Sequence, residues 1–469
     1  MKKFRSLDKA VLEDYKCGDG SSSPAPLGSM LRVSKIVYYF STIRDFVNKY
    51  DEELHKDEEV QQSKSSDRHK HKKFVKFVNT TNVITRHCND NERHLKSTLI
   101  KKPILLSEIL TFLRENRNFI QECTDLFSDD YVLRPLEDQL KSPDDFPKLN
   151  MEDDFEMLLE RKFDADVVEF DDEFDNNELL FAIVVNRTEK RIICVFRGSV
   201  SGGKDWSTNT KVFRTKVGDI KDADKDLGLK EFGNMGLHRG FANYLFSDEW
   251  TKDGLPSKFE QIVETLREIR TKRDRNGNRY KDYSIFVTGH SLGGALSQLL
   301  SFALAGSTLT RDEFPKPVTA ITFASPRVGN RDWLREYQSL EKKGHLRHIR
   351  VSNDGDRVCV VPTFPIGYLQ TGVNVHLYSN KKADVDYNKQ RSRFSAIQCS
   401  NPLTMHGLDS YYERLVGNER NQRIMKYSVE KFYKKYATEK ITENVDEYDV
   451  YGFKEADHTA ELYRDFLSS

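Results

Sequence analysis

The sequence predicts an α/β fold with a mostly parallel central sheet, joined to an N-terminal helical accessory region. From about residue 165 onward, short apolar runs alternate with longer segments in which apolar residues recur every three or four positions. This alternation is typical of parallel strands that are connected by helices. Before residue 135 the apolar residues follow helical spacing alone, notably at 31–55 and 105–127.

The expected elements follow from these patterns in chain order. Apolar runs predict strands, and helical spacing predicts the helices between them. The expected strands are 165–170, 179–185, 191–196, 283–288, 318–323, 346–351 and 373–378. The expected helices of the same region are 259–270, 292–306, 332–340 and 408–416.

Composition divides the chain into five expected regions. Residues 1–30 include a Gly-, Ser- and Pro-rich stretch, which is typical of disorder. The other regions are a helical accessory region at 31–135, an acidic linker at 136–164, an α/β domain at 165–420 and a charged C-terminal extension at 421–469. The run from His69 to Lys73 could hold a metal or an anion, but a solvated linker is the simpler interpretation.

Composition also excludes some classes of function. The 469 residues contain 74 Lys and Arg and 74 Asp and Glu, so the zero net charge argues against a general nucleic-acid binder. The six cysteines form no C-x-x-C pair, so neither a zinc site nor a redox motif is indicated. We expect the protein to need no metal and no organic cofactor. The basic start is not followed by a signal-peptide pattern or a membrane-spanning stretch. We therefore expect a soluble, cytoplasmic protein whose contact with membranes is at most peripheral.

The most informative segment is the G-x-S-x-G pentapeptide Gly289-His290-Ser291-Leu292-Gly293. An apolar run precedes it and a helix-forming run follows it, which is the strand–turn–helix setting of a nucleophile elbow. The sharp turn should force strained dihedral angles on Ser291. Gly289 and Gly293 should be needed because a side chain at either position would collide with neighbouring backbone.

A serine nucleophile needs a general base and a carboxylate that orients the base. In this type of sheet the acid and then the histidine follow the serine in the chain. Asp354 and Asp356 both lie just beyond the expected strand 346–351, although an Asn-Asp-Gly turn with solvated carboxylates would use the same residues. His376, His406 and His458 follow; His406 lies at a loop-to-helix junction and is favoured over His376.

The reaction also needs donors that stabilise an oxyanion. One donor is the backbone N–H of the residue after the nucleophile, Leu292. The second should follow an early strand, and the strand at 191–196 runs into Arg197-Gly198-Ser199. Ser199 is therefore the candidate for the second donor.

Taken together, these motifs resemble the class 3 lipases, the fungal-lipase-like branch of the α/β-hydrolases. The resemblance covers roughly residues 165–420. The matching pieces occur in the family's order: Phe196 to Ser199, Asp205-Trp206, His238 to Tyr244, Thr288 to Gly294, Phe323 to Asn330, Asn353 to Val358 and His406 to Tyr412.

The resemblance implies a role for several residues. The pattern Asn-x-x-Asp-x-Val falls on Asn353, Asp356 and Val358, and so implies that Asp356 is the acid. The pattern His-x-Leu-x-x-Tyr implies that His406 is the base. Ser199 aligns with the family's oxyanion-hole Ser or Thr, and His376 is expected to be structural. The chain departs from the family where three residues, Cys359 to Val361, separate Val358 from Pro362.

The implied activity is that of a serine carboxylic ester hydrolase, a lipase acting on acylglycerols. Phospholipids or galactolipids are alternative substrates, and acyl transfer to another alcohol is a third possibility. A non-catalytic lipase-like module that binds a protein partner is the competing interpretation. Residues 207–237 are expected to form a lid, or else a surface loop, and residues 364–366 either line an acyl groove or pack in the core.

Overall fold

The structure is a computed structural model, and it describes only part of the chain. The described residues are 27–31, 33–34, 37–38, 104–105, 165–170, 181–187, 189–198, 214–216, 228–229, 232–233, 235–247, 256–273, 277–362, 367–388, 390, 405–415, 418–425 and 427–441. The chain forms two units. One comprises 1–31, 196–263 and 284–469, and the other comprises 32–195 and 264–283.

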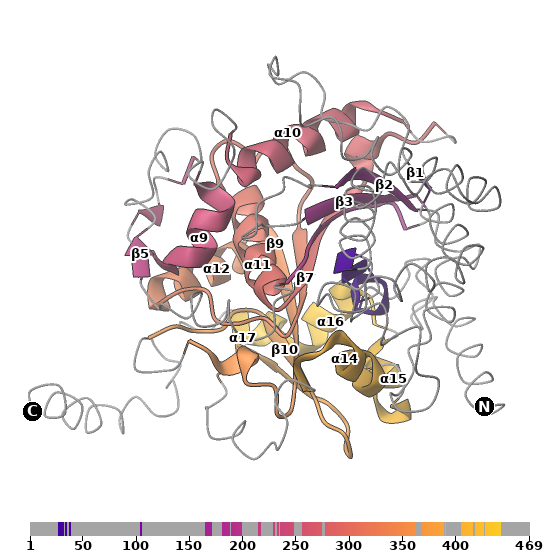
Figure 1. Cartoon of the computed structure of the whole chain (residues 1–469), viewed down its shortest axis with the longest axis vertical. Coiled ribbons are helices and arrows are strands. Elements are labelled where there is room, and N and C mark those ends of the chain that lie inside the picture. Colours follow the sequence, from indigo (N-terminus) through magenta and orange to yellow (C-terminus); the bar gives the residue numbers. More distant parts are fainter. Residues whose placement is uncertain are drawn as a thin grey trace, which may run out of the picture. The chain divides into compact units, whose positions relative to one another are not determined.

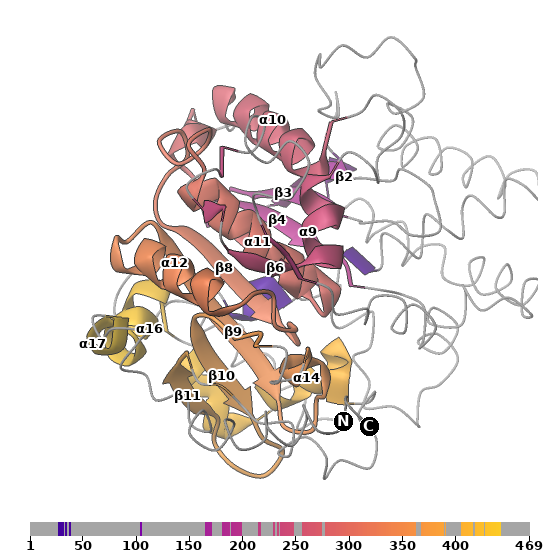
Figure 2. The ribbon, with the colours of Figure 1, turned by 90° about the vertical axis from the view of Figure 1, so that its left-hand side faces the viewer.

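The first unit contains a mostly parallel sheet in the order β7-β8-β9-β10-β11. Figure 2 shows β8 to β11 side by side. β7 to β10 run parallel to their neighbours, and β11 pairs antiparallel with β10. Every residue of β8 and β10 is buried, as expected for strands covered on both faces. The strand bounds are Ser284–His290, Val318–Phe323, Leu346–Asn353, Val373–Leu377 and Asp384–Tyr387.

Helices connect and cover these strands. α11 (Leu292–Gly306) packs on β7 and β8, and all its residues after Leu292 are buried because nearly all of them are apolar or small. α12 (Arg331–Lys342) is amphipathic and begins at Asn330, whose side chain accepts a hydrogen bond from the backbone N–H of Trp333. α14 (Leu408–Leu415) contacts β9 and β10. α9 (Arg239–Phe246) packs against α11 (Figure 1).

The second unit contains most of the early strands in the order β1-β2-β3-β4. β2 is antiparallel to β1 and to β3. β3 and β4 are buried along their whole length, as their uninterrupted apolar runs require. The bounds are Ile104–Leu105, Ala165–Phe170, Phe181–Asn186 and Arg191–Phe196. α10 (Lys258–Thr271) is shared between the two units.

The expected α/β fold with a mostly parallel sheet is confirmed. The strands at 165–170, 191–196 and 318–323 and the helix at 292–306 have the expected bounds. The other expected strands and helices of residues 165–420 are present with ends shifted by one or two residues. The sequence did not indicate α9, β11 or the hairpin of β5 (Arg214–Lys216) and β6 (Gly236–His238).

Two expectations for the N-terminal part need correction. Disorder was expected up to residue 30, but residues 27–31 are helical, and Leu27, Met30 and Leu31 are at most 2% exposed. Their i, i+3, i+4 spacing gives this short segment an apolar face that can be buried. The helix expected at 105–127 does not begin at Leu105, which belongs to β1. Residues 106–127 lie outside the described part.

The range expected to be a charged extension contains α15 (Gln422–Met425), α16 (Val429–Tyr436) and α17 (Thr438–Ile441) (Figure 1). Val429, Phe432 and Tyr433 of α16 are buried, and α17 packs on α12. An apolar stripe at i, i+3 and i+4 is therefore embedded in a charged sequence. Among the described residues, no helix is long and apolar enough to cross a membrane.

Candidate active site

Ser291 occupies the sharp turn between β7 and α11. Its φ of 58° and ψ of −125° lie in a region that residues with a side chain rarely adopt, so the expected strain is present. A Cβ atom on Gly289 would come within 2.4 Å of the Gly293 carbonyl oxygen, and one on Gly293 within 2.3 Å of the Phe196 carbonyl oxygen. Both obstacles are backbone atoms, so the two positions require glycine. The Ser291 N–H also donates to the Phe323 carbonyl across 3.0 Å.

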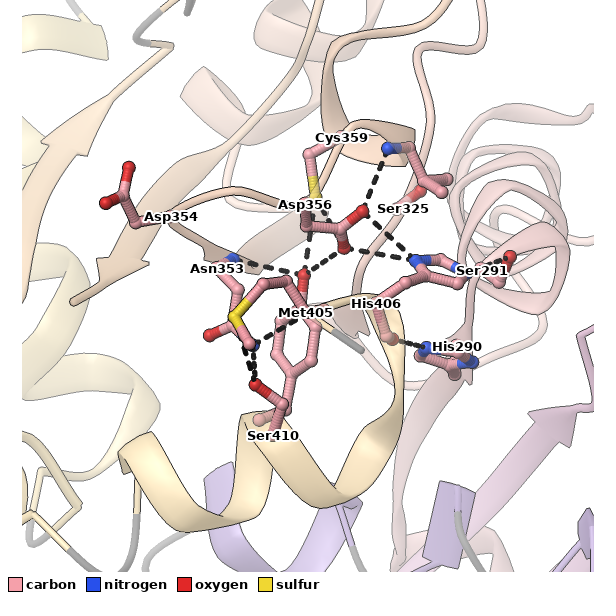
Figure 3. Close-up of polar contacts among 12 residues, drawn as sticks. His290, Ser291, Ser325, Asn353, Asp354, Asp356, Cys359, Met405, His406 and Ser410 are labelled. Carbon is pink, nitrogen blue, oxygen red and sulfur yellow. Dashed lines mark hydrogen bonds and ion pairs between the residues drawn. The ribbon is translucent and has the colours of Figure 1, made fainter. Parts of the chain in front are cut away.

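His406 lies between Ser291 and Asp356 (Figure 3). Its Nε2 is 2.9 Å from the Ser291 Oγ, and its Nδ1 is 3.1 Å from each carboxylate oxygen of Asp356. With the proton on Nδ1, the ring donates to the carboxylate and its Nε2 accepts the serine hydroxyl proton. The three side chains, 115 and 50 residues apart along the chain, thus form one continuous hydrogen-bonded chain.

The Asp356 carboxylate is buried and accepts further hydrogen bonds. The Val358 N–H donates to it across 2.8 Å, the Tyr411 hydroxyl across 2.6 Å and the Cys359 thiol across 3.5 Å. Burial, and next the negative charge of Asp356, raise the pKa values of Tyr411 and Cys359 well above their usual ranges. Both groups therefore keep their protons and act as donors to the carboxylate.

The other acid and histidine candidates lie elsewhere. The Asp354 side chain is 49% exposed and points away from His406 (Figure 3), and its Oδ1 is 3.6 Å from the His376 Nε2. The Nδ1 of His376 is 2.9 Å from the Ser352 Oγ, so this ring bridges β9 and β10. His458 lies outside the described residues.

Of the expected oxyanion-hole residues, only Leu292 is described. It is the first residue of α11, where backbone N–H groups have no acceptor within the helix. Ser199 lies outside the described part, which reaches Gly198 on this side. The backbone just before it runs against the elbow, as the close approach of the Phe196 carbonyl to Gly293 shows.

Most of the expected lid and the expected acyl-groove segment cannot be described. In this region β5 pairs antiparallel with β6, so residues 214–216 lie beside residues 236–238 in a two-stranded sheet. Residues 364–366 lie outside the described part. Among the described residues, no group of three or more His, Cys, Asp or Glu side chains is arranged to hold a metal ion.

The sequence did not indicate the residues that support the three central side chains. The Nε2–H of His290 donates to the His406 carbonyl across 2.7 Å, although the sequence placed His290 only in the elbow turn. Burial, and next the proximity of His406, lower the pKa of His290 to about 3, so its ring is neutral near pH 7. The Nδ2 of Asn353 donates to the Met405 carbonyl and to the Ser410 Oγ, each across 3.1 Å. The only indication in the sequence that Asn353 supports the site was its place in the pattern Asn-x-x-Asp-x-Val.

Comparison with known proteins supports the resemblance. Residues 193–366 match the family described as Lipase (class 3). Galactolipase DONGLE, chloroplastic, of Arabidopsis thaliana is 32% identical over 184 residues, which are 38% of this chain and 36% of that protein. Phospholipase A1-Igamma1, chloroplastic, of the same plant is 39% identical over 174 residues, which are 36% of this chain and 31% of that protein.

Among solved structures, the lipase from Rhizopus microsporus var. chinensis is 22% identical with a TM-score of 0.39, and the match covers 54% of this chain and 76% of that one. The chain spans about a third of the length of the two Arabidopsis relatives. His406 lies beyond residues 193–366, whereas Ser291 and Asp356 lie within them. The resemblance to the class 3 lipases that was read from the motifs is thus confirmed by the family match over residues 193–366.

Proposed function

We propose that this protein is a serine carboxylic ester hydrolase that releases fatty acids from acylglycerols. The observation that carries the proposal is the hydrogen-bonded chain from the Ser291 hydroxyl through His406 to the Asp356 carboxylate. This arrangement activates a serine hydroxyl for attack on an acyl carbonyl. A protein that only binds partners has no need for these three side chains in this geometry.

In the proposed reaction, His406 removes the proton from Ser291 as the Oγ attacks the ester carbonyl. His406 then protonates the leaving alcohol, and water releases the fatty acid from the acyl-enzyme by the same steps. Asp356 holds the ring with Nδ1 protonated, so that Nε2 faces the serine. The carboxylate is suited to this task because Val358, Tyr411 and Cys359 all donate to it.

We further propose that the N–H groups of Leu292 and Ser199 bind the oxyanion. Two features support this assignment. Leu292 begins α11, whose N-terminal dipole favours negative charge, and the strand that leads to Ser199 approaches the elbow at Phe196. Preorganised donors of this kind contribute roughly 10²–10³-fold to turnover.

The proposal is tested by fatty-acid release from emulsified triacylglycerol. Ser291→Ala should lower turnover by about 10⁶-fold, as in serine proteases. Ser301→Ala is the matched control, because it removes a buried hydroxyl of α11, the helix that follows Ser291, and this hydroxyl donates to the Gln298 carbonyl. Equal release by the native chain and Ser291→Ala would contradict the proposal. No release by either, on short-chain and phospholipid esters as well, would favour the non-catalytic partner-binding module.

A second candidate substrate class is glycerolipids with a polar head group. The observation that favours it is that the curated relatives are named as a galactolipase and as phospholipases A1. The same assay, run in parallel on phosphatidylcholine and galactosyl diacylglycerol, ranks the three substrates. A preference for either polar lipid would replace triacylglycerol in the proposal and leave the mechanism unchanged.

Other features of the proposal rest on the sequence. These are the lid at 207–237, the five-region division of the chain and peripheral contact with lipid surfaces. The joining of β5 and β6 is compatible with a lid that is anchored at both ends. The cellular location stays a prediction, and two of the relatives are named as chloroplastic.

A further inference from the structure

The peptide groups on both sides of His406 accept hydrogen bonds from two side chains that are not members of the Ser291–His406–Asp356 chain. The carbonyl of Met405 belongs to the peptide before His406 and accepts from the Nδ2 of Asn353 across 3.1 Å. The carbonyl of His406 belongs to the peptide after it and accepts from the Nε2 of His290 across 2.7 Å. Figure 3 shows the two contacts on opposite sides of the His406 backbone.

Each peptide group is planar, so fixing the two planes fixes the backbone dihedral angles of His406. The ring then has only its own rotamers to adjust, and these depend on the backbone conformation. The Nε2 and Nδ1 atoms of His406 must meet the Ser291 Oγ at 2.9 Å and the Asp356 carboxylate at 3.1 Å. A displacement of about 1 Å in such a site can cost about 100-fold in rate.

We propose that His290 and Asn353 are positioning residues that clamp the backbone of His406 and so set the distance between the base and the nucleophile. This inference rests on the proposed function. His290 precedes Ser291 in the chain, so one covalent step and one hydrogen bond link the nucleophile to the base. Asn353 ends β9, three residues before Asp356, and links the base to the strand that carries the acid.

The chemistry of both residues supports a donor role. His290 is 6% exposed and neutral near pH 7, and a neutral ring that donates to a carbonyl from Nε2 carries its proton there. The Oδ1 of Asn353 is buried and has no hydrogen-bond partner among the described residues. A buried acceptor without a partner costs stability, and a leucine of the same shape would avoid that cost. The two hydrogen bonds that Nδ2 donates therefore explain why this position holds an amide side chain.

Four variants separate the clamp from simple packing. His290→Phe keeps the ring and loses the donor. His290→Gln keeps a donor three bonds from Cβ, as in histidine, and loses the ring. Asn353→Leu keeps the shape and loses both Nδ2 donors, while its backbone N–H can still donate to the Tyr411 hydroxyl. His376→Phe is the matched control, because it changes a buried histidine of the same sheet that contacts Ser352 and Asp354.

The first readout is the rate at which diethyl p-nitrophenyl phosphate phosphorylates Ser291, together with kcat and KM on p-nitrophenyl butyrate. We expect His290→Phe and Asn353→Leu to lower the labelling rate and kcat by about 10–100-fold with KM unchanged. His290→Gln should stay within about threefold of the native rate, since it restores the donor. The inference is overturned if the Gln variant is as slow as the Phe variant, or if every variant labels at the native rate.

A second readout needs no turnover, and it keeps the clamp testable if the native chain neither labels nor hydrolyses esters. In NMR spectra of histidine-labelled protein, the Nδ1–H proton of His406 bound to Asp356 should be shifted far downfield. The signal should persist in His290→Gln and in His376→Phe, and it should weaken or broaden in His290→Phe and Asn353→Leu. Persistence in all variants would overturn the clamp whatever the activity, whereas silence in the labelling assay alone would count against the proposed function.

Discussion

Two aspartates that are two residues apart differ completely in their surroundings. The Asp356 side chain is fully buried and holds hydrogen bonds from His406, Tyr411 and the Val358 N–H. The Asp354 side chain is half exposed beside His376, and its backbone carbonyl accepts from Arg414. Only Asp356 can therefore orient the ring of His406.

Replacing the two aspartates in turn tests this difference. Asp356→Asn should lower kcat by about 10⁴-fold, because an amide can hold the ring in the wrong tautomer. Asp354→Asn removes a solvated charge and should change kcat by less than about threefold. Steady-state hydrolysis of a soluble ester measures both. A large loss in Asp354→Asn with near-normal activity in Asp356→Asn would reverse the proposed assignment of the acid.

A second effect at the scale of single residues is the requirement for glycine at position 293, where the Phe196 carbonyl leaves no room for a side chain. Gly293→Ala would put a methyl group 2.3 Å from the Phe196 carbonyl oxygen, and neither backbone can move aside cheaply. We expect a loss of about 1–3 kcal/mol or more in unfolding free energy, together with displacement of Ser291. Thermal unfolding and ester hydrolysis measure the two effects.

The control lies in the same helix. Gly306→Ala would meet only the ends of the Leu340 and Phe232 side chains, at 3.1 and 3.3 Å, and alanine favours a helix by about 1 kcal/mol. Its stability should stay within about 1 kcal/mol of the native value. If the two variants unfold at the same temperature, crowding at the elbow is not what requires glycine there.

At the scale of elements, a buried acid joins α12 to β11 and α16. Glu341 of α12 accepts from the Tyr387 hydroxyl across 2.6 Å and from the Tyr433 hydroxyl across 2.7 Å. The Tyr433 oxygen is also 2.8 Å from the His348 carbonyl oxygen, yet it carries a single proton. A protonated Glu341 would donate to Tyr433 and leave that proton for His348. Burial raises the pKa of Glu341 to about 7, although the hydrogen bonds from Tyr387 and Tyr433 act in the opposite direction.

This raised pKa predicts a pH-dependent stability. The folded state holds the proton more tightly than the unfolded state, whose pKa is about 4.5. The contribution of Glu341 is therefore fully present below about pH 4.5 and is lost as the pH rises to about 7, by up to about 3 kcal/mol. Glu341→Gln removes this titration. Urea unfolding at pH 5 and pH 8 measures the difference in unfolding free energy between the Gln variant and the native chain. This difference should shift in favour of the variant at pH 8. The same difference at both pH values would contradict the raised pKa of Glu341.

At the scale of the whole molecule, patterns of neighbouring residues predicted the elements well where burial is continuous. β8 and α11 could be predicted from the sequence because all or nearly all of their residues are buried, which gives each an almost continuous run of apolar or small residues. α16 was missed because its three buried residues, Val429, Phe432 and Tyr433, are separated and surrounded by charges. That stripe packs near β11, and Tyr433 also forms hydrogen bonds with Glu341 of α12 and with the His348 carbonyl of β9, all of which are far away in the sequence.

The sequence by itself determined the elbow, because the strain on Ser291 and the need for Gly289 and Gly293 arise within five consecutive residues and the strand and helix beside them. It left two aspartates and three histidines as candidates until the family resemblance favoured Asp356 and His406. Only the tertiary structure decided which of them meet, since the contacts of His406 with Ser291 and Asp356 span 115 and 50 residues. The supporting donors His290 and Asn353 became visible for the same reason: a hydrogen bond between distant segments depends on how strands and helices pack, and local patterns do not encode that packing.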